Sequence, residues 1–436
     1  MRIRFTWRVG ALGAIALSTL GLGCLTPAVA SAWRSHKPPA PPTLFVNGSI
    51  LSGYGHNSCS TASYTTIDQA VTAATPGSHI IVCPGTYDEG VQIDKPLVLS
   101  GLDAVIDASS SSFGNGVQIL GPGGSGSTIK GFKIEKAKFE GILVGTAPVA
   151  PSTIGGTPAV TVGAPVSDVT IADNTLIENG TGFGTEAGQC FSTPEAPGDC
   201  GETIHLVSVT DSVVEGNYVA NNVGGILLTD EFGPTSGNIV RDNQSLNNTD
   251  DCGITLAGHS SAAVDPVTGL PTGAAGVFDN TVEHNVSDGN GVAGQGAGIL
   301  LGGGAPFAGV YSNVIRDNVA RGNGLSGVTV HQHLAGDLNG NVIEGNTLVD
   351  DNLDGDFDFA AASATETTGI LVASGAPPKA VLPPELLPGP ITGTIIRGNR
   401  FFDVKVGIWT LGIDKTSTQI NGNVFGPGVT TPISEN

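Results

Sequence analysis

Short apolar strands alternate with asparagine-containing turns along most of the chain. Each repeat has an apolar residue, an Asn three positions later, in most copies a second Asn five positions further on, and then a Gly before an apolar strand. The copies read IADNTLIEN, VEGNYVANN, VRDNQSLNN, VEHNVSDGN, IRDNVARGN, IEGNTLVDD and IRGNRFFDV, and their first asparagines are Asn174, Asn217, Asn243, Asn285, Asn318, Asn346 and Asn399. A repeat of roughly 25 residues that contains short strands predicts a solenoid of stacked β-coils.

The second Asn of the repeat occurs at Asn179, Asn222, Asn248, Asn290 and Asn323. Asn tolerates the left-handed backbone of a sharp corner, and its amide can hydrogen-bond the Asn at the same place in the next coil. We therefore expect asparagine ladders along the solenoid. A leucine-rich repeat would show a Leu consensus instead, which these copies lack.

A charged column stands two residues before the first Asn of successive repeats. Its members alternate in sign: Glu215, Arg241, Glu283, Arg316, Glu344 and Arg397. Because stacked coils lie ~4.8 Å apart, we expect an ion-pair ladder on the outside of the solenoid. Exposed pairs contribute only ~0–1 kcal/mol each, so we assign the ladder to register and not to chemistry.

One amphipathic helix is expected before the repeats, over residues 65–74. Thr66 is a suitable N-cap, and Ile67, Ala70, Val71 and Ala74 fall on one face. The strand-like segment HIIVC, the turn PGTY and the segment VQIDKPLVLSG follow it. The apolar face of such a helix would cover the open end of the coils.

The repeats, this helix and the segment HIIVCPGTYDEGVQIDKPLVLSG resemble the right-handed parallel β-helix repeat proteins of the pectin-lyase-like superfamily, which includes NosD-like periplasmic proteins. The resemblance covers about residues 43–430. It implies an all-β, right-handed parallel β-helix of about ten coils, capped by a short N-terminal α-helix. Residues 43–107 would form the cap and first coils, 108–430 the repeats, and 431–436 a C-terminal tail. The superfamily hosts lyases, hydrolases, epimerases, adhesins and copper-maturation factors, so the fold does not name one function.

The N-terminus has the pattern of a signal peptide, which we expect over residues 1–32. A basic start is followed by an apolar run from Val9 to Leu25 and by A-x-A cleavage sites near Ala30. Lipidation of Cys24 is disfavoured, because the Leu usually found three residues earlier is missing. A Pro-rich linker follows over 33–42. We therefore expect a secreted protein, extracellular, periplasmic or at the cell surface, with no membrane span and monomeric.

The charge composition limits the kinds of molecule that this protein can bind. The chain has 18 Lys and Arg against 39 Asp and Glu, a net charge of −21, and losing Arg2, Arg4 and Arg8 with residues 1–32 makes it −24. Nucleic acid is excluded as a partner, because this surface cannot neutralise a phosphate backbone. A polyuronate would also be repelled unless a cation bridged it to the protein.

Export makes disulfides possible. We expect Cys59 to pair with Cys83 and Cys190 with Cys200, which leaves Cys252, just before a strand, as a buried free thiol. None of these spacings is a zinc pattern.

Aligning the strands on the residue after the Gly brings polar residues together at odd positions, which we expect to face solvent. The predicted catalytic row on this outer face is Asp230, Glu231, His259, His331 and His333, beside a notch at Gly302, Gly303 and Gly304. Three interpretations stay open. The row could supply a general acid and base for a bound sugar chain, or His259, His331, His333 and Glu231 could ligate a transition metal. It could also be solvated loop ends without a role.

A second candidate is the acidic loop DDNLDGD, residues 350–356. Its pattern D-x-N-x-D-G suits Ca²⁺, with Asp350, Asn352, Asp354 and Asp356 as the predicted ligands. The bidentate Glu expected at position twelve is missing, since Ala361 stands there. A solvated acidic loop is the alternative.

The resemblance and the predicted export favour a secreted carbohydrate-active protein, a polysaccharide lyase or glycoside hydrolase. The alternative is a non-enzymatic NosD-like or surface β-helix protein that binds metal or glycan. Copper delivery would favour soft ligands, and Met occurs only at position 1.

Overall fold

The computed structural model describes residues 41–48, 58–145, 152–154, 157–159, 164–182, 201–259, 275–303, 305–359 and 365–435. All of them belong to one compact unit, Pro41–Asn436. The residues assigned to the signal peptide, and all but the last two of the Pro-rich linker, lie outside the described part. In that part, no helix has the length and apolar character needed to cross a bilayer.

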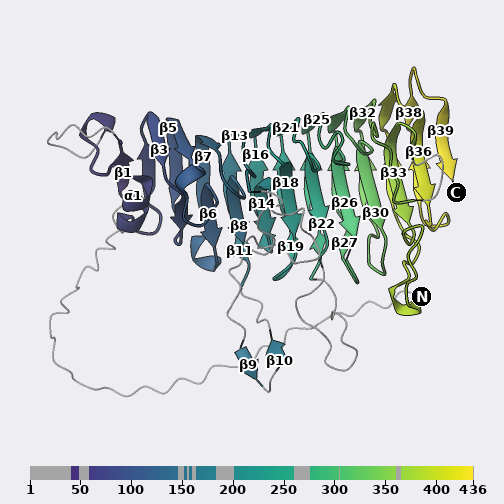
Figure 1. Ribbon diagram of the computed structural model, residues 1–436, viewed down its shortest axis with the longest axis horizontal. Helices are drawn as coiled ribbons and strands as arrows, with labels where there is room; N and C mark the ends of the chain where they lie inside the picture. Colours follow the sequence, from purple (N-terminus) through teal and green to yellow (C-terminus); the bar gives the residue numbers. More distant parts are fainter. Residues whose placement is uncertain are drawn as a thin grey trace, which may run out of the picture. The chain divides into compact units, whose positions relative to one another are not determined.

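The chain winds into coils that follow one another in sequence order from α1 (Ile67–Ala73) to β39 (Thr431–Glu435) (Figure 1). Strands at the same place in successive coils pair in parallel and in register, and the paired strands form rows along the stack. Row 3 is an eleven-stranded parallel sheet, whereas row 4 contains five short strands. The predicted parallel β-helix with an N-terminal helix is confirmed.

Row 1 comprises β1 (Thr43–Val46), β2 (His79–Val82), β5 (Val98–Asp107), β7 (Thr128–Glu135), β12 (Thr170–Ala172), β16 (Val213–Glu215), β20 (Ile239–Arg241), β24 (Thr281–Glu283), β28 (Val314–Arg316), β31 (Val342–Glu344), β34 (Ile395–Arg397) and β37 (Gln419–Asn421). Row 2 comprises β3 (Gly85–Asp88), the second halves of β5 and β7, β13 (Thr175–Ile177), β17 (Tyr218–Ala220), β21 (Gln244–Leu246), β25 (Val286–Asp288), β29 (Val319–Arg321), β32 (Thr347–Val349), β35 (Arg400–Phe402) and β38 (Val424–Phe425).

Row 3 comprises β4 (Val91–Ile93), β6 (Val117–Leu120), β8 (Ile142–Gly145), β14 (Glu202–Val207), β18 (Gly224–Thr229), β22 (Ile254–Ala257), β26 (Ile299–Gly303), β30 (Val328–Gln332), β33 (Thr368–Ser374), β36 (Val406–Leu411) and β39. Row 4 comprises β11 (Val166–Ser167), β15 (Val209–Thr210), β19 (Thr235–Ser236), β23 (Val277–Phe278) and β27 (Val310–Tyr311). A separate antiparallel pair joins β9 (Ser152–Ile154) to β10 (Thr157–Ala159), and single 3₁₀ turns lie at Cys59–Thr61, Ala108–Ser110, Pro122–Gly124 and Pro384–Leu386.

Inward-facing apolar side chains fill the coils, one above the other. The first inward-facing residue of the aligned row 3 strands is an Ile or Val in successive coils. Each of these residues is at most 1% exposed: Ile226, Ile254, Ile299, Val328, Ile370 and Ile408. β-Branched side chains suit such columns because they are stiff and pack well on a pleated surface.

The helix α1 forms as predicted. The Thr66 side chain accepts a hydrogen bond from the backbone N–H of Gln69, and Ile67, Ala70 and Val71 are buried against the first coils. The Glu89 carboxylate caps the same helix end, accepting from the backbone N–H of Ile67. The helix therefore begins where two side chains satisfy its first free N–H groups.

The asparagine ladders are confirmed. Asn217 is 1% exposed, and both its backbone N–H and its Nδ2 donate to Oδ1 of Asn243 in the next coil. Its Nδ2 also donates to the Ile171 carbonyl of the preceding coil. A further ladder, not noticed in the sequence, runs through Ser212, Asn238, Asn280, Asn313 and Asn341.

The expected left-handed backbone of the ladder asparagines is wrong. The residue just before each Asn takes that conformation instead, as at Asp242 and Gly216, with φ of 55° and 64°. The ladder Asn must direct its amide into the corner, so the exposed residue before it makes the turn.

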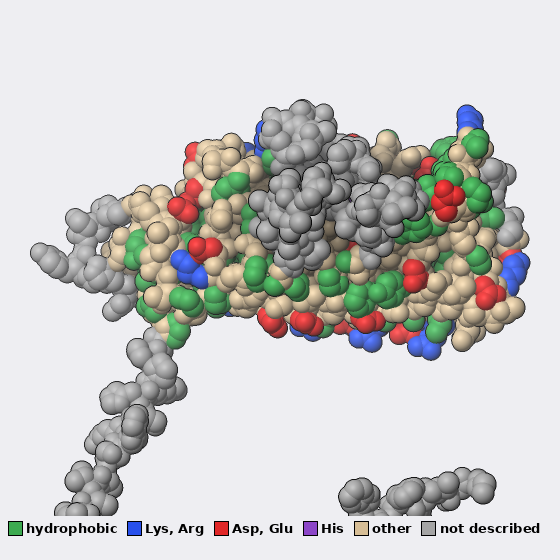
Figure 2. All heavy atoms as spheres, turned by 90° about the horizontal axis from the view of Figure 1, so that it is seen from below, with side chains coloured by type: hydrophobic (Ala, Val, Ile, Leu, Met, Phe, Trp, Pro, Cys, Tyr) green, Lys and Arg blue, Asp and Glu red, His purple; other side chains and the backbone are tan. Residues whose placement is uncertain are grey.

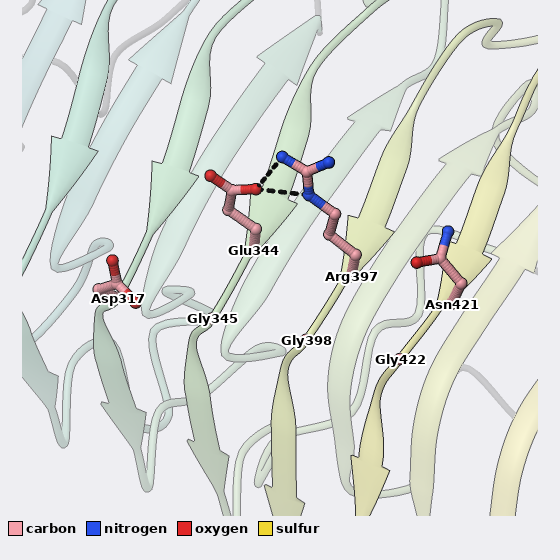
Figure 3. A pocket seen from close by; sticks show the side chains of 7 residues that line it. All are labelled: Asp317, Glu344, Gly345, Arg397, Gly398, Asn421 and Gly422. Carbon is pink, nitrogen blue, oxygen red and sulfur yellow. Dashed lines mark hydrogen bonds and ion pairs between the residues drawn. The ribbon is translucent and has the colours of Figure 1, made fainter.

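The Glu/Arg column lies in one register along row 1, as predicted. Each Arg pairs with the Glu of the preceding coil, so the column consists of separate pairs, not a continuous chain. Nε of Arg397 lies 2.6 Å from Oε2 of Glu344, in a shallow hollow that Asp317 and Asn421 also line (Figure 3). The other pairs are Glu215–Arg241 and Glu283–Arg316.

The Cys59–Cys83 disulfide is present, with an S–S distance of 2.02 Å, and Cys252 is a buried free thiol. Cys190 and Cys200 lie outside the described residues. At the C-terminus, residues 431–435 are not the expected tail. They form β39, which pairs in parallel with β36 and places Ile433, 40% exposed, beside the buried Ile408.

Candidate metal centre

The predicted functional row does lie in register on row 3. Thr229, Ala257, Gly302 and His331 occupy the same place in four successive strands. The side chains that follow them leave the ends of these strands on the outer face of the sheet. The alignment predicted from the sequence is therefore correct for the residues within the strands.

The expected exposure of this face is wrong. Asp230, Glu231 and His259 are only 2%, 5% and 7% exposed. The predicted notch is filled at Gly303, where the buried Leu338 occupies the space of a side chain, whereas a Cβ at Gly302 would meet only Leu300, at 3.5 Å. Gly304 lies outside the described residues. The sequence pattern identified the face but gave no sign of what packs on it.

Glu231 and His259 form a buried pair. Oε1 of Glu231 lies 2.6 Å from Nδ1 of His259. Burial acts to raise the pKa of Glu231, but the charge and hydrogen bond of His259 outweigh it and lower that pKa to about 2. This geometry holds a carboxylate against an imidazole, the arrangement by which proteins orient a general base.

Asp230 instead holds the backbone. Its two carboxylate oxygens accept from the N–H groups of His259 and Gly276, at 2.7 and 2.6 Å. Burial raises the pKa of Asp230 to about 6, although these two hydrogen bonds oppose the shift. The side chain therefore ties the end of one coil to the start of β23.

Two polar residues next to this pair were missed from the sequence. Nε2 of His205 lies 3.0 Å from Oγ1 of Thr229, and its Nδ1 lies 3.7 Å from Oε1 of the buried Glu140. Since side chains alternate along a strand, the positions directly after the inward Ile also face outward. His205 follows Ile204 in β14, so extending the alignment by one column would have found it.

His331, His333 and Asp358 form a separate cluster at the end of β30. One potential ligand atom from each lies within 4.8 Å of the others, and no second group of three such residues occurs in the part of the chain that the structure describes. The group contains neither Glu231 nor His259, so the predicted row is divided in two.

Hydrogen bonds orient the imidazoles of this cluster. Nδ1 of His333 donates to the Gly375 carbonyl, 3.1 Å away, and Nε2 faces Asp358 at 3.6 Å. Burial acts to lower the pKa of His333, but the contacts with Asp358 and the Gly375 carbonyl outweigh it and raise that pKa, so a metal ion would displace a proton from Nε2. Nδ1 of His331 is buried without a hydrogen-bond partner. Burial, and then the charge of His333, lower the pKa of His331 to about 4, so this ring is neutral at neutral pH.

Aromatic rings enclose the cluster on one side. The Phe359 ring lies 5.0 Å from that of His333 and 5.6 Å from that of the fully buried Trp409. Asp358 is on the open side, with its side chain 60% exposed. An ion could therefore enter past Asp358 and meet two fixed imidazoles.

These donors fit a divalent transition-metal ion. Two imidazole nitrogens and one carboxylate oxygen form a set used for Zn²⁺ and Cu²⁺. A buried imidazole nitrogen without a hydrogen bond is costly in an empty site, and a metal ion would satisfy it. The Gly375 carbonyl accepts from the other ring nitrogen of His333, the kind of contact that usually orients a ligating His.

The predicted calcium ligands, in contrast, bind other parts of the protein. Oδ2 of Asp354 accepts from the backbone N–H of Ala293, and Nδ2 of Asn352 donates to the Glu366 carbonyl. Asp356 keeps one buried oxygen without a hydrogen bond. A calcium site in this loop stays a prediction.

Comparison with known proteins supports the fold. A model of the family "Periplasmic copper-binding protein (NosD)" matches residues 163–307. The structure of an alginate lyase from Paenibacillus sp. str. FPU-7 is similar with a TM-score of 0.50 and 14% identity, over 87% of this chain and 99% of that one. The A-module of Azotobacter vinelandii mannuronan C-5 epimerase AlgE4 gives a TM-score of 0.46 and 16% identity, over 85% and 93%. No curated protein matches.

Proposed function

We propose that this chain, a right-handed parallel β-helix repeat protein of the pectin-lyase-like superfamily, binds a divalent transition-metal ion through His331, His333 and Asp358. One observation carries the proposal: three ligand atoms from a strand and a following loop lie within 4.8 Å of one another. The orientation of His333 by the Gly375 carbonyl supports it.

The ligand chemistry favours Zn²⁺ or Cu²⁺ over Cu⁺. Cu⁺ prefers thiolate and thioether sulfur, and the chain has a single Met, at position 1. The buried Cys252 sulfur already accepts a hydrogen bond from the backbone N–H of Ala297, at 3.1 Å. The matched family is described as copper-binding, and that description supports a metal role without identifying the ligands, because the match ends before His331.

We also propose that the protein is exported. The Cys59–Cys83 disulfide supports this, because disulfides persist in oxidising compartments. The basic and apolar pattern of residues 1–32 and the periplasmic description of the matched family point the same way.

The test is metal titration by calorimetry on the metal-free protein, with Zn²⁺ and Cu²⁺ as probes. We expect one equivalent to bind, His331→Ala and Asp358→Asn to weaken binding at least tenfold, and melting temperatures of the metal-free variants to stay close to wild type. His284→Ala is the matched control, because this His is half exposed on row 1 and lies beside a carboxylate, Asp317. Equal affinity of His331→Ala and wild type would overturn the proposal.

A second candidate is a polysaccharide-processing activity at the buried pair of Glu231 and His259. The pair places an ionised carboxylate against the imidazole of His259, which can orient that ring as a general base, and Asp230 fixes the backbone of His259. The alginate lyase with the same fold shows that such a scaffold accommodates this kind of enzyme. A polysaccharide panel read for unsaturated products and for reducing ends tests it. An activity that survives in His259→Ala would exclude this pair.

A further inference from the structure

Two aromatic rings stack on the outside of row 4. Phe278 ends β23 and Tyr311 ends β27, and the two residues are register partners. Their ring centroids are 5.0 Å apart and their planes differ by only 2°. Both side chains are partly exposed, unlike the stacked pair Phe401–Phe425, in which Phe401 is fully buried in the core.

Small residues precede the rings in the same column. The register places Ser236 beside Phe278, and Thr210 beside Ser236. A Ser side chain is too small to cover the face of a phenyl ring. The stack therefore ends at a step, where one aromatic face borders a short hydroxyl side chain.

Two glycines keep the backbone beside the rings bare. A Cβ at Gly276 would lie 3.1 Å from both the Phe278 and the Tyr311 rings, and its φ of +100° also disfavours a side chain. A Cβ at Gly309 would lie 3.4 Å from the Tyr311 ring. The rings can lie close over this corner only because neither glycine carries a side chain.

Carboxylates surround the stack. Asp279, next to Phe278, and Asp337 are exposed, and Asp230 reaches the corner by accepting from the Gly276 N–H. Burial first, and then the charges of Asp337, Asp279 and Asp230, raise the pKa of Tyr311. Figure 2 shows the molecule from below the view of Figure 1, where Asp and Glu side chains are scattered among hydrophobic and other side chains.

We propose that Phe278 and Tyr311 form a stacking platform for a sugar ring of a neutral polysaccharide. Aromatic side chains supply apolar area with a fixed orientation, and the C–H face of a sugar ring packs on such area. The flanking carboxylates accept hydrogen bonds from sugar hydroxyls but repel uronates, which a chain with a net charge of −21 also disfavours.

The platform does not depend on the metal site. It adjoins the pair of Glu231 and His259 through Gly276 and Asp230, so it would serve as a binding subsite for the second candidate function. If the protein has no catalytic activity, the platform would still act as a glycan-binding surface. Metal-free and metal-loaded protein should therefore bind polysaccharide equally well.

Affinity electrophoresis of the full chain tests the platform. The neutral probes are laminarin, xylan and galactomannan, and the anionic probes are alginate and polygalacturonate. We expect at least one neutral polysaccharide to retard the protein. In Tyr311→Ala and Phe278→Ala, the dissociation constant for that polysaccharide should be three- to tenfold larger than in wild type. Tyr218→Ala is the matched control, because Tyr218 is 37% exposed on row 2.

Three outcomes overturn the proposal: no retardation by a neutral polysaccharide, equal losses in Tyr218→Ala and Tyr311→Ala, or binding restricted to the anionic probes. If Tyr311→Ala does not fold, the binding of Tyr311→Phe and Phe278→Leu tests the platform instead. The first keeps the ring and should bind within about threefold of wild type, whereas the second removes the aromatic face and should bind more weakly.

Discussion

Glu231 and His259 lie 28 residues apart in the sequence, yet Oε1 of the carboxylate is 2.6 Å from Nδ1 of the imidazole in the next coil. Both side chains are nearly inaccessible to solvent. A charge buried at such a place is tolerated only with its partner, because the cost of desolvation must be offset by the pair. Substitutions in this pair should therefore affect the stability of the fold as well as any chemistry on this face.

Glu231→Gln should lower the free energy of unfolding by about 3 kcal/mol near neutral pH, because it leaves His259 buried without its partner charge. The folded-state pKa of Glu231, about 2, lies below its ordinary 4.5. The contribution is therefore complete above the ordinary value and is lost as pH falls toward 2. Urea unfolding across this range should show the difference between wild type and variant shrinking with acid. Glu344→Gln, in an exposed pair, should cost less than about 1 kcal/mol.

Much of the fold could be predicted because it repeats. The ladder asparagines, such as Asn217 and Asn243, and the alternating charges of Glu215 and Arg241 recur at fixed positions, so each copy confirms the register of the others. The helix was predictable for a local reason, the N-cap at Thr66. These features depend on neighbours along the chain or at the same place in the next coil.

The candidate site was only partly predictable, because loops complete it. His331, in β30, and His333, directly after its end, could be placed on one face from their spacing alone. Asp358 joins them from a loop whose path has no repeat, and the packing of Phe359 and Trp409 on the same face has no periodic signature. His205 was missed for a simpler reason, since the outward column directly after the inward Ile or Val was not followed.

The Glu/Arg pairs should fix register more than they add stability. A double-mutant cycle on Glu344→Gln and Arg397→Gln should give a coupling energy of about 0.2–1 kcal/mol, because the side chains are 26% and 54% exposed and water screens the pair. Salt should reduce it further. Chemical denaturation at low and high ionic strength measures the coupling. A coupling well above 2 kcal/mol would show that the ladder stabilises the fold directly.

The disulfide should stabilise the N-terminal end of the coils. Replacing both Cys59 and Cys83 by Ser should cost about 3 kcal/mol, because the bond closes a loop of 24 residues in the unfolded chain. In the unreduced protein, peptides containing these residues should escape alkylation. Cys252 should react only after unfolding, since burial raises the pKa of its thiol well above its ordinary value. Alkylation of Cys59 without reductant would contradict the pairing.

Asp351 occupies a place in an asparagine ladder. Its Oδ1 accepts from both the backbone N–H and the Nδ2 of Asn323, as an Asn would, and its side chain is fully buried. Burial raises the pKa of Asp351 to about 8, although the hydrogen bonds from Asn323 oppose the shift. An acid in this ladder therefore remains largely protonated at neutral pH.

Asp351→Asn should stabilise the protein near pH 8 by on the order of 2 kcal/mol and change little near pH 4. The folded-state pKa lies above the ordinary 3.8, so the folded protein holds an extra proton between the two values, and wild-type stability falls as pH rises through them. An amide does not titrate, and its Nδ2 can donate to the Ala320 carbonyl, which matches the Ser287 carbonyl that Asn323 uses, while the 3.3 Å hydrogen bond that Oδ2 accepts from the Val349 N–H is lost. Urea unfolding between these pH values measures the effect. Asp350→Asn, at an exposed neighbouring position, should leave most of the pH dependence in place, because the charge of Asp350 is the smallest of the effects that raise the pKa of Asp351. If Asp351→Asn keeps the wild-type decline in stability with rising pH, Asp351 is not the group that causes it.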